Sequence, residues 1–571
     1  MPRISSSEAF VEVLVAQGVT HIFGIVGSAY MDALDLFEPA GIKFISVAHE
    51  QNAAHMADGF SRVSGRHGVC IGQNGPGITN FVTAIAAAYW AHSPVVAITP
   101  ESGSGGVGLG GFQETDQMPI FSKITKYQVH VNRPERIAEL TSRAFNIALA
   151  ERGPVQINIP RDHFYAEFDT VIPKPIRFEG TAGSPQSVAQ AAQLLAAAKF
   201  PVIVAGGGVI VANAGAALRE LAELLSAPVA ASYLHNDAFP ANHPLSVGPL
   251  GYQGSKAAMN IVAKADVILA LGSRLGPFGT LPQYGIDYWP KDAKVIQVDC
   301  DQRAIGLVKA IAVGIHGDAR LVAEALVGQL RKATLAAQPT RQQRLAQVAA
   351  AKSQWEAELN DISSSADASP MSPRRVLREL QKAMPANAMV STDIGNICSI
   401  ANSYLPFNSY PGFLAPMSFG NCGYAFPTAI GAKVARPDRP AVAYVGDGAW
   451  GMSLTEVMTV VRENIPVVAI VYNNGQWGAE KRNQIDFYAD RFVGTNLKNA
   501  SFAAIARAMG AEGITISHPD QVGDALRKAI ASNRPTVLEM MVNQELGEPF
   551  RRDALKKPKR LLAKYAAFTV P

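Results

Sequence analysis

The protein has 571 residues, enough for roughly three to four domains of ordinary size. Hydrophobic residues make up 48% of the chain and charged residues 17%, so the chain can bury large cores, which excludes an intrinsically disordered protein. The formal net charge of +4 is nearly balanced for this length, and no cluster of Lys and Arg precedes the tail. We therefore expect no nucleic-acid partner.

The spacing of the cysteines and the hydropathy of the sequence indicate the cellular compartment in which we expect the protein. The four cysteines, Cys70, Cys300, Cys398 and Cys422, lie far apart and predict no disulfide framework, which fits a reducing cytoplasm. The opening MPRISSSEAF has no apolar segment of the kind found in signal peptides. No apolar run approaches the roughly 20 residues of a membrane span, so we expect no membrane partner.

The first region, residues 1–170, alternates strands with helices. Ser5 and Glu8 form a predicted capping box before a helix that ends near Gly18. The sequence then predicts strands at 21–27, 43–50, 68–72 and 94–100, with helices at 52–63 and 81–91 between them. Such alternation predicts a parallel sheet with helices on both faces.

The same pattern recurs twice. Residues 185–335 form a second α/β region, with strands at 201–206, 266–272 and 294–299. Residues 336–370 are rich in Ala, Gln and Ser and predict a helical linker. Residues 371–545 form a third α/β region, with strands at 388–393, 441–447, 466–474 and 536–542. The basic tail, 546–571, is expected on the surface, as a solvated extension or as a contact with a partner chain. The predicted fold is α/β, with three doubly wound parallel-sheet domains.

The third region carries the decisive motif. Gly446, Asp447 and Gly448 follow one strand, and Asn474 ends the next, 474 − 447 = 27 residues later. Because consecutive parallel strands end side by side, these residues can converge. A carboxylate, an amide oxygen and a nearby backbone carbonyl suit Mg²⁺ that shares its ligands with a diphosphate, and the start of the next helix favours the anion. The predicted metal ligands are Asp447, Asn474 and Gln476, and the predicted diphosphate contacts are Gly446, Asp447, Gly448, Ala449 and Asn474.

Two other motifs compete with this interpretation. Gly446, Gly448 and Gly451 also satisfy G-x-G-x-x-G, but a dinucleotide site expects an acidic residue at the end of the second strand, which here ends in asparagine. A second G-x-G-x-x-G begins at Gly103 and has no clear helix after it. HEQNAAH fails as a zinc motif because Ala53 stands where the second histidine is required.

The spacing of GDG and NN resembles the signature of the thiamine diphosphate (ThDP) enzymes related to acetolactate synthase and pyruvate oxidase. The segments 47–65, 75–77 and 111–116 (GFQETD) are also similar to that family. The resemblance implies a pyrimidine-binding domain at 1–170, a central domain at 185–335 and a diphosphate-binding domain at 371–545. It also implies that Glu50 shares a proton with N1′ of the pyrimidine and so promotes loss of the thiazolium C2 proton. On its own, Glu50 could instead be an acid that favours a helix N-terminus.

The same resemblance implies further roles. Gly420 would offer its carbonyl to the 4′-amine, and Asn396 would contact the diphosphate or serve as a turn residue. Cys422 would take the wedge position that bends the cofactor, where relatives carry a larger apolar residue, or it is a small buried hydrophobe. His92 aligns with an active-site histidine, and a structural role is equally open. Phe112 and Gln113 would line the substrate channel.

Residues 419–427, 473–488 and 550–565 resemble one group in this superfamily, the sulfoacetaldehyde acetyltransferases of taurine degradation. That resemblance implies conversion of sulfoacetaldehyde and phosphate to acetyl phosphate and sulfite, with Mg²⁺ and without FAD, in a homodimer or homotetramer. A pyruvate-using acetolactate synthase or oxidase and a non-catalytic ThDP-binding protein remain as alternatives. Lys481 or Arg482 is the first candidate for binding the anions, followed by Tyr30, His92 and the backbone amides of the glycine turn at 26–30.

Overall fold

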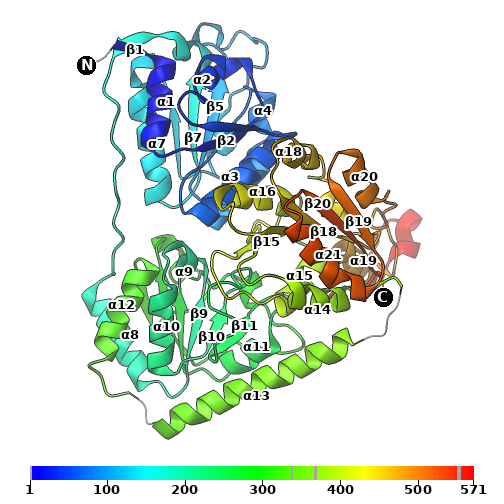
Figure 1. Ribbon diagram of the computed structural model, residues 1–571. Helices are drawn as coiled ribbons and strands as arrows, with labels where there is room; N and C mark the ends of the chain where they lie inside the picture. Colours follow the sequence, from blue (N-terminus) through cyan, green and yellow to red (C-terminus); the bar gives the residue numbers. More distant parts are fainter. Residues whose placement is uncertain (1–2, 336–337, 365–368, 549–554, 571) are drawn as a thin grey trace.

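The computed structural model describes residues 3–335, 338–364, 369–548 and 555–570. Three α/β domains follow one another along the chain, each built on a six-stranded parallel sheet (Figure 1). Each sheet buries an apolar cluster on both of its faces. This arrangement confirms the predicted doubly wound α/β fold.

The N-terminal domain has the strand order β3-β2-β4-β5-β7-β6. The predicted capping box is present, because the Glu8 backbone N–H donates to Ser5 Oγ at 3.2 Å and the Ser5 N–H donates to Glu8 Oε2 at 2.6 Å. A short antiparallel pair, β1 (Arg3–Ser5) and β8 (Glu167–Asp169), closes the domain. Its other elements are β2 (His21–Gly24), β3 (Lys43–Ser46), β4 (Gly68–Ile71), β5 (Val95–Glu101), β6 (Tyr127–His130), β7 (Val155–Pro160), α1 (Ser6–Ala16), α2 (Met31–Asp35), α3 (Glu50–Ser64), α4 (Pro76–Thr79), α5 (Val82–Ala91), α6 (Met118–Phe121) and α7 (Ile137–Ala150).

The central domain follows an extended segment that runs down one side of the molecule (Figure 1). Its strand order is β11-β10-β9-β12-β13-β14, and every pairing is parallel. The elements are β9 (Pro201–Ala205), β10 (Val229–Ala231), β11 (Ser246–Pro249), β12 (Val267–Leu271), β13 (Lys294–Asp299), β14 (Val313–His316), α8 (Pro185–Ala197), α9 (Gly207–Val211), α10 (Gly215–Leu225), α11 (Lys256–Val262) and α12 (Ala319–Leu330).

The C-terminal domain has the order β16-β15-β17-β18-β20-β19. Its strands are β15 (Met389–Thr392), β16 (Phe413–Leu414), β17 (Ala441–Gly446), β18 (Val467–Asn473), β19 (Glu512–Ile516) and β20 (Thr536–Met541). Its helices are α14 (Pro373–Ala383), α15 (Asn396–Tyr404), α16 (Ala425–Ala435), α17 (Asp447–Trp450), α18 (Glu456–Arg462), α19 (Gly478–Tyr488), α20 (Phe502–Ala508) and α21 (Pro519–Ala531).

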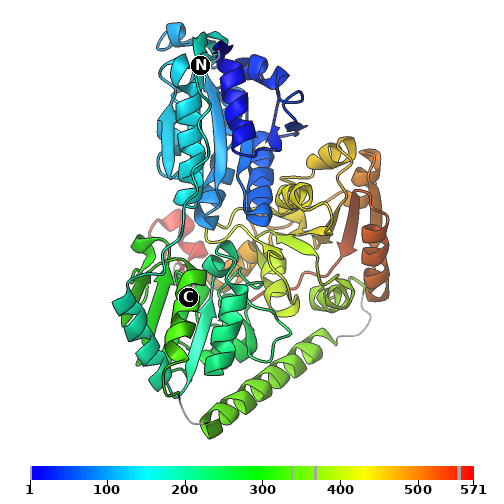
Figure 2. The ribbon, with the colours of Figure 1, turned by 60° about the vertical axis from the view of Figure 1, so that its left-hand side comes forward.

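One long helix, α13 (Gln338–Ser363), connects the central and C-terminal domains along the lower edge of the molecule (Figures 1 and 2). Trp355 and Leu359 bury their side chains in the C-terminal domain's cluster. The rest of the predicted 336–370 linker includes 336–337 and 365–368, which lie outside the described residues. In the tail, a 3₁₀ turn at Ala563–Phe568 contacts the C-terminal domain, where Arg491 Nη2 donates to the Phe568 carbonyl at 3.0 Å; residues 549–554 and 571 are not described.

The N- and C-terminal domains share one core. Helix α3 packs on α16, and side chains of both domains belong to the same apolar cluster. The helices approach closely because each has a glycine at the crossing: a Cβ on Gly59 would lie 2.1 Å from the Thr428 carbonyl oxygen, and one on Gly431 would lie 1.9 Å from that of Met56. The first residue of α3 is Glu50, so this packing fixes where Glu50 stands. No helix in the described ranges is long and apolar enough to cross a membrane.

Candidate active site

A cavity of about 310 Å³ opens at the carboxyl ends of β17 and β18. Because Gly446 pairs with Tyr472 in the parallel ladder, Asp447 and Asn474 follow side by side. The cavity gathers every residue that the sequence predicted to hold the cofactor or the metal: Asn396, Gly420, Cys422, Gly446, Asp447, Gly448, Ala449, Asn474 and Gln476. Convergence at the strand ends of a doubly wound sheet is the expected place for a ligand.

Among the described residues, two acidic residues line the cavity: Asp447, directly after β17, and Glu480, in α19. Asp447 Oδ2 accepts hydrogen bonds from the Gly475 backbone N–H at 2.7 Å and Asn499 Nδ2 at 2.8 Å, and its Oδ1 accepts from the Gly448 N–H at 2.9 Å. Burial raises the pKa of Asp447, and these donors partly oppose that shift. A bound cation would further stabilise the ionised carboxylate.

The cavity fits a metal and a diphosphate. Both polar atoms of the buried Gln476 side chain lack a hydrogen-bond partner, and a buried amide without partners indicates a missing polar ligand. Helices α15 and α19 both begin at the cavity, so their N–H groups favour an anion. The described part of the chain contains no cluster of three or more His, Cys, Asp or Glu side chains that could hold a metal. An ion here would rely on one carboxylate together with amide, carbonyl and phosphate oxygens, which suits Mg²⁺.

The segment with Gly420 and Cys422 is held from β15. Asp393, directly after that strand, accepts hydrogen bonds from the backbone N–H groups of Tyr424 at 2.9 Å and Ala425 at 3.2 Å, where α16 begins. Burial raises the pKa of Asp393 to about 7. Burial also raises the pKa of Cys422 to about 12, so this thiol stays protonated and presents a small apolar surface to the cavity.

Glu50 stands outside this cavity. It lies at the start of α3, where its Oε2 accepts a hydrogen bond from Asn80 Nδ2 at 2.9 Å. The turn at Gly77 passes so close that a Cβ there would lie 3.1 Å from Glu50 Oε1. Burial first, and the negative charge of Glu50 second, raise the pKa of Tyr30, whose hydroxyl donates to the Ile25 carbonyl at 2.5 Å. Tyr30, Gly77 and Asn80 thus lie around Glu50 and form a second cluster with it. None of these residues lines the cavity at Asp447.

The loop with Phe112 and Gln113 belongs to this second cluster. Gln113 Oε1 accepts from Gln73 Nε2 at 2.9 Å, and its carbonyl accepts from Asn74 Nδ2 at 3.0 Å. Phe112 is 88% exposed.

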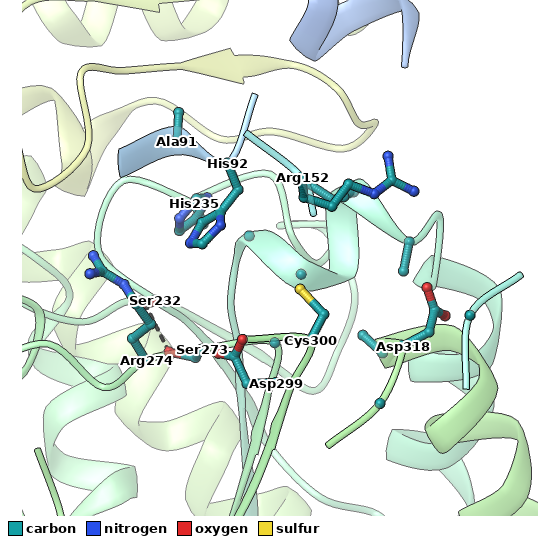
Figure 3. Close-up of a pocket in the computed structure, with 18 of the residues that line it drawn as sticks. Ala91, His92, Arg152, Ser232, His235, Ser273, Arg274, Asp299, Cys300 and Asp318 are labelled. Carbon is teal, nitrogen blue, oxygen red and sulfur yellow. Dashed lines mark hydrogen bonds between the residues drawn. The ribbon is translucent and has the colours of Figure 1, made fainter. Parts of the chain in front are cut away.

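His92 lies in a different cavity, of about 320 Å³, between the N-terminal and central domains (Figure 3). It ends α5 in the left-handed conformation, and its ring lies beside that of His235, with Cys300 and Arg274 on the same cavity wall. Burial first, and the nearby cations Lys126 and Arg274 second, lower the pKa of His92 to about 4. His92 therefore lines another cavity than Asp447 does, although Tyr233 lines both, and Glu50 lines neither.

Lys481 and Arg482 lie in the second turn of α19 and line neither cavity. Lys481 Nζ donates to Asn496 Oδ1 at 2.9 Å and Gln544 Oε1 at 3.0 Å. Arg482 forms an ion pair with Asp486, with Nη2 and Oδ1 3.1 Å apart.

Three aromatic residues of the central domain also line the cofactor cavity: Tyr233, Tyr252 and Phe278. No sequence motif predicts them, because they lie in connecting segments of another domain. Trp477 and Glu480 complete the wall beside Gln476, and a Cβ on Gly448 would collide with the Trp477 ring at 2.7 Å. The second glycine of GDG is therefore needed for this close approach.

Comparison with protein families gives three matches along the chain. Residues 4–120 match the N-terminal TPP binding domain of thiamine pyrophosphate enzymes, residues 188–326 their central domain and residues 393–540 their C-terminal TPP binding domain. The chain belongs to the thiamine pyrophosphate enzymes. Thiamine pyrophosphate is ThDP, so the ThDP family predicted from the motifs is confirmed.

Several named enzymes are similar to this chain over nearly its full length. A sulfoacetaldehyde acetyltransferase of Alcaligenes xylosoxydans xylosoxydans is 59% identical over 99% of this chain and 97% of its own length. One of Castellaniella defragrans is 59% identical over 99% and 98%. A probable acetolactate synthase large subunit of Methanocaldococcus jannaschii is 34% identical over 95% and 92%.

Proposed function

We propose that this ThDP enzyme is a sulfoacetaldehyde acetyltransferase, which uses Mg²⁺ and converts sulfoacetaldehyde and phosphate to acetyl phosphate and sulfite. The similarity over the full chain length to relatives of that name carries the choice of substrate. The residues that line the cavity beside Asp447 support the assignment of ThDP as the cofactor. Acetolactate synthase relatives are more distant, at 34% identity or below among those compared, so a pyruvate-using enzyme is not favoured.

The proposed reaction balances without an oxidant. Sulfoacetaldehyde and hydrogenphosphate contain the same atoms and charge as acetyl phosphate and hydrogensulfite. The aldehyde carbon is oxidised to the acyl level, while its neighbour loses sulfite and is reduced to a methyl group. ThDP, when bound, supplies the nucleophilic carbon and the electron sink that such a rearrangement needs. Since no electrons leave the substrate, we expect no FAD.

Different residues of the chain would bind the metal, the diphosphate and the pyrimidine of the cofactor. Asp447 and Asn474, with the Gln476 carbonyl, would hold the metal, and Asn396 with the GDG amides would bind the diphosphate. Gly420 and Cys422 would orient the pyrimidine. Glu50 would share a proton with N1′, held in its rotamer by the Asn80 side chain.

A second copy of the chain would complete each site. Glu50 does not line the cavity of its own chain, and Phe112 beside Gln113 is exposed. Both observations support a homodimer, or a homotetramer built from dimers, in which Glu50, Phe112 and Gln113 face the cavity of the neighbouring copy. Tyr30 is only 1% exposed, so in this arrangement it stays buried near Glu50. In this arrangement His92 serves as a structural or ligand-binding residue of the other cavity.

Of the two basic candidates, Arg482 is the one we propose for the anionic substrates. Burial raises the pKa of Tyr252, a cavity residue, and the charge of Arg482 weakly opposes this rise, which supports the choice of Arg482 over Lys481. Lys481 binds Asn496 and Gln544 instead. Rotation of Arg482 away from Asp486 would present its planar fork to a sulfonate or a phosphate.

A role in taurine degradation in the cytoplasm follows from the proposed substrate. All four cysteines are free thiols, which agrees with a reducing compartment.

The decisive test is an incubation of the purified protein with sulfoacetaldehyde, phosphate, ThDP and Mg²⁺. We expect sulfite and acetyl phosphate in equal amounts, and neither product from the Asp447→Ala variant. A parallel incubation with pyruvate should give no acetolactate. Acetolactate formation without sulfite release would overturn the proposed substrate, and an absorption spectrum of bound flavin would overturn the expectation that FAD is absent.

A further inference from the structure

A buried carboxylate of the C-terminal domain contacts the start of the helix that carries Glu50. Glu456 is the first residue of α18, and its side chain is 0% exposed. Its oxygens accept hydrogen bonds from the Ala48 backbone N–H at 3.2 Å, the His49 N–H at 3.1 Å and Asn52 Nδ2 at 2.8 Å. All three donors belong to the N-terminal domain, and α18 lies against the end of α3 in Figure 1.

The N–H of His49 is one of the donors that a helix leaves unsatisfied at its N-terminus, while the Ala48 N–H lies just before the helix and Asn52 donates with its side-chain amide. His49 is the N-cap of α3, and its own Nδ1 accepts only from the Gln51 N–H, at 3.2 Å. Glu456 is therefore the hydrogen-bond acceptor for the N–H groups of Ala48 and His49, for which α3 itself provides no acceptor. A carboxylate at the positive end of a helix, accepting several N–H bonds, forms a strong and directional contact.

Position in the chain links this contact to both parts of the proposed site. Glu50 directly follows His49, so the backbone that Glu456 holds is the one that sets the direction of the Glu50 side chain. Glu456 also lies only 456 − 447 = 9 residues after Asp447, beyond the short helix α17. Thr459 Oγ1 donates to Glu456 Oε2 at 2.7 Å and fixes the carboxylate from within α18.

We propose that Glu456 is a positioning residue for the reaction: it holds the start of α3 so that Glu50 meets the pyrimidine N1′ in the geometry for proton transfer. The inference rests on the proposed role of Glu50 and assigns Glu456 no contact with substrate or cofactor. Small displacements of a proton-transfer group cost large factors in rate, so a carboxylate that acts only through the backbone can still affect the chemistry.

The variant Glu456→Gln tests this with three measurements. Its amide NH₂ would face backbone N–H groups that need an acceptor, so part of the contact is lost. Hydrogen exchange of the cofactor-free protein should show faster exchange at the Ala48 and His49 amides. NMR of bound ThDP should show C2 proton exchange at least tenfold slower. Calorimetric titration of ThDP with Mg²⁺ should give an affinity within about threefold of wild type, since the diphosphate contacts are untouched, a difference below about 0.7 kcal/mol.

Glu463→Gln is the matched control. Glu463 belongs to the same region and crosses the same domain boundary, with its Oε2 3.2 Å from Lys43 Nζ, but it meets the start of β3 instead of α3. We expect wild-type C2 exchange in this variant. A merely structural effect would slow C2 exchange in both variants, or lower ThDP affinity in step with it, and either outcome would overturn the proposal.

The outcome can be separated from that of the proposed function. C2 exchange needs no sulfoacetaldehyde, so it is independent of the substrate. If Glu50→Gln itself exchanges at the wild-type rate, the role of Glu50 fails; if Glu50→Gln is slow and Glu456→Gln is not, only the positioning role fails. Should Glu456→Gln not fold, Asn52→Ala removes one of the three donors in α3 and its approach, and we then expect exchange two- to fivefold slower at unchanged ThDP affinity. Wild-type exchange in Asn52→Ala would overturn the proposal.

Discussion

The Asp447 cavity and the Glu50 cluster differ in how one chain builds them. Around Asp447, residues from two adjacent strand ends and three helix starts converge within a single domain, and nine predicted residues share one cavity. Around Glu50, the contacts with Asn80 and Gly77 stay within the N-terminal domain and reach no cofactor cavity. The groups proposed to bind the cofactor thus line one cavity of a single copy, whereas Glu50 does not line that cavity.

This difference separates two kinds of site residue. We propose that the Asp447 side binds the cofactor, since its groups are oxygens and N–H donors suited to a metal and a diphosphate. We propose that the Glu50 side transfers the proton. Substitutions on the two sides should therefore have different signatures: loss of cofactor on one side, and slow chemistry with the cofactor bound on the other.

The largest expected effect is that of Glu50→Gln on cofactor activation. The amide cannot share the N1′ proton, so C2 proton exchange of bound ThDP should slow by about 10²- to 10⁴-fold. Titration should give ThDP affinity within about threefold of wild type, because no diphosphate contact changes. NMR of the bound cofactor measures the exchange. Exchange at the wild-type rate would remove Glu50 from the mechanism.

Asp447→Ala should produce the opposite signature. Without its carboxylate the metal bridge to the diphosphate is lost, and we expect ThDP affinity in the presence of Mg²⁺ to fall by about 100-fold, equivalent to about 2.7 kcal/mol. Calorimetric titration measures this. Thermal unfolding of the cofactor-free variant is the control, since relief of a buried carboxylate should not lower its stability. Unchanged affinity would refute the metal assignment.

The two sides also differ in how far sequence predicts them. Asp447 and Asn474 were predictable because the strand–helix–strand spacing and the parallel register together fix where the side chains emerge. The aromatic wall of Tyr233, Tyr252 and Phe278 was not, since it depends on how the central domain packs against the C-terminal domain. The three sheets followed from alternating strands and helices, whereas the cavity that His92 lines depends on how the N-terminal domain packs against the central domain, which no local pattern records.

A smaller effect is expected at the edge of the cavity. Arg482→Ala should raise the Michaelis constant for sulfoacetaldehyde or phosphate by about tenfold, equivalent to about 1.4 kcal/mol, if its guanidinium binds the anion. Lys481→Ala, one residue away and directed at Asn496 and Gln544, should change either constant by less than about twofold. Steady-state kinetics with each substrate varied in turn measures both. Equal constants in wild type and both variants would place the anion site elsewhere, with Tyr30 and the backbone amides of 26–30 next to examine.

The smallest expected effect, activity recovered on mixing two inactive variants, tests most directly whether the Asp447 cavity and Glu50 of one site belong to different copies of the chain. If Glu50 serves the cavity of a neighbouring copy, subunits that carry Glu50→Gln and subunits that carry Asp447→Ala, each inactive alone, complement each other when mixed. Random exchange makes half of the dimers hybrid, and one of the two sites in each hybrid holds an intact Glu50 and an intact Asp447, so about a quarter of wild-type activity should return. Native mass spectrometry of differently tagged subunits confirms that exchange has occurred. Mixed dimers without recovered activity would show that each chain builds its own site, and Glu50 would then have to reach Asp447 by a movement of α3 against α16, whose glycine contacts leave it little room.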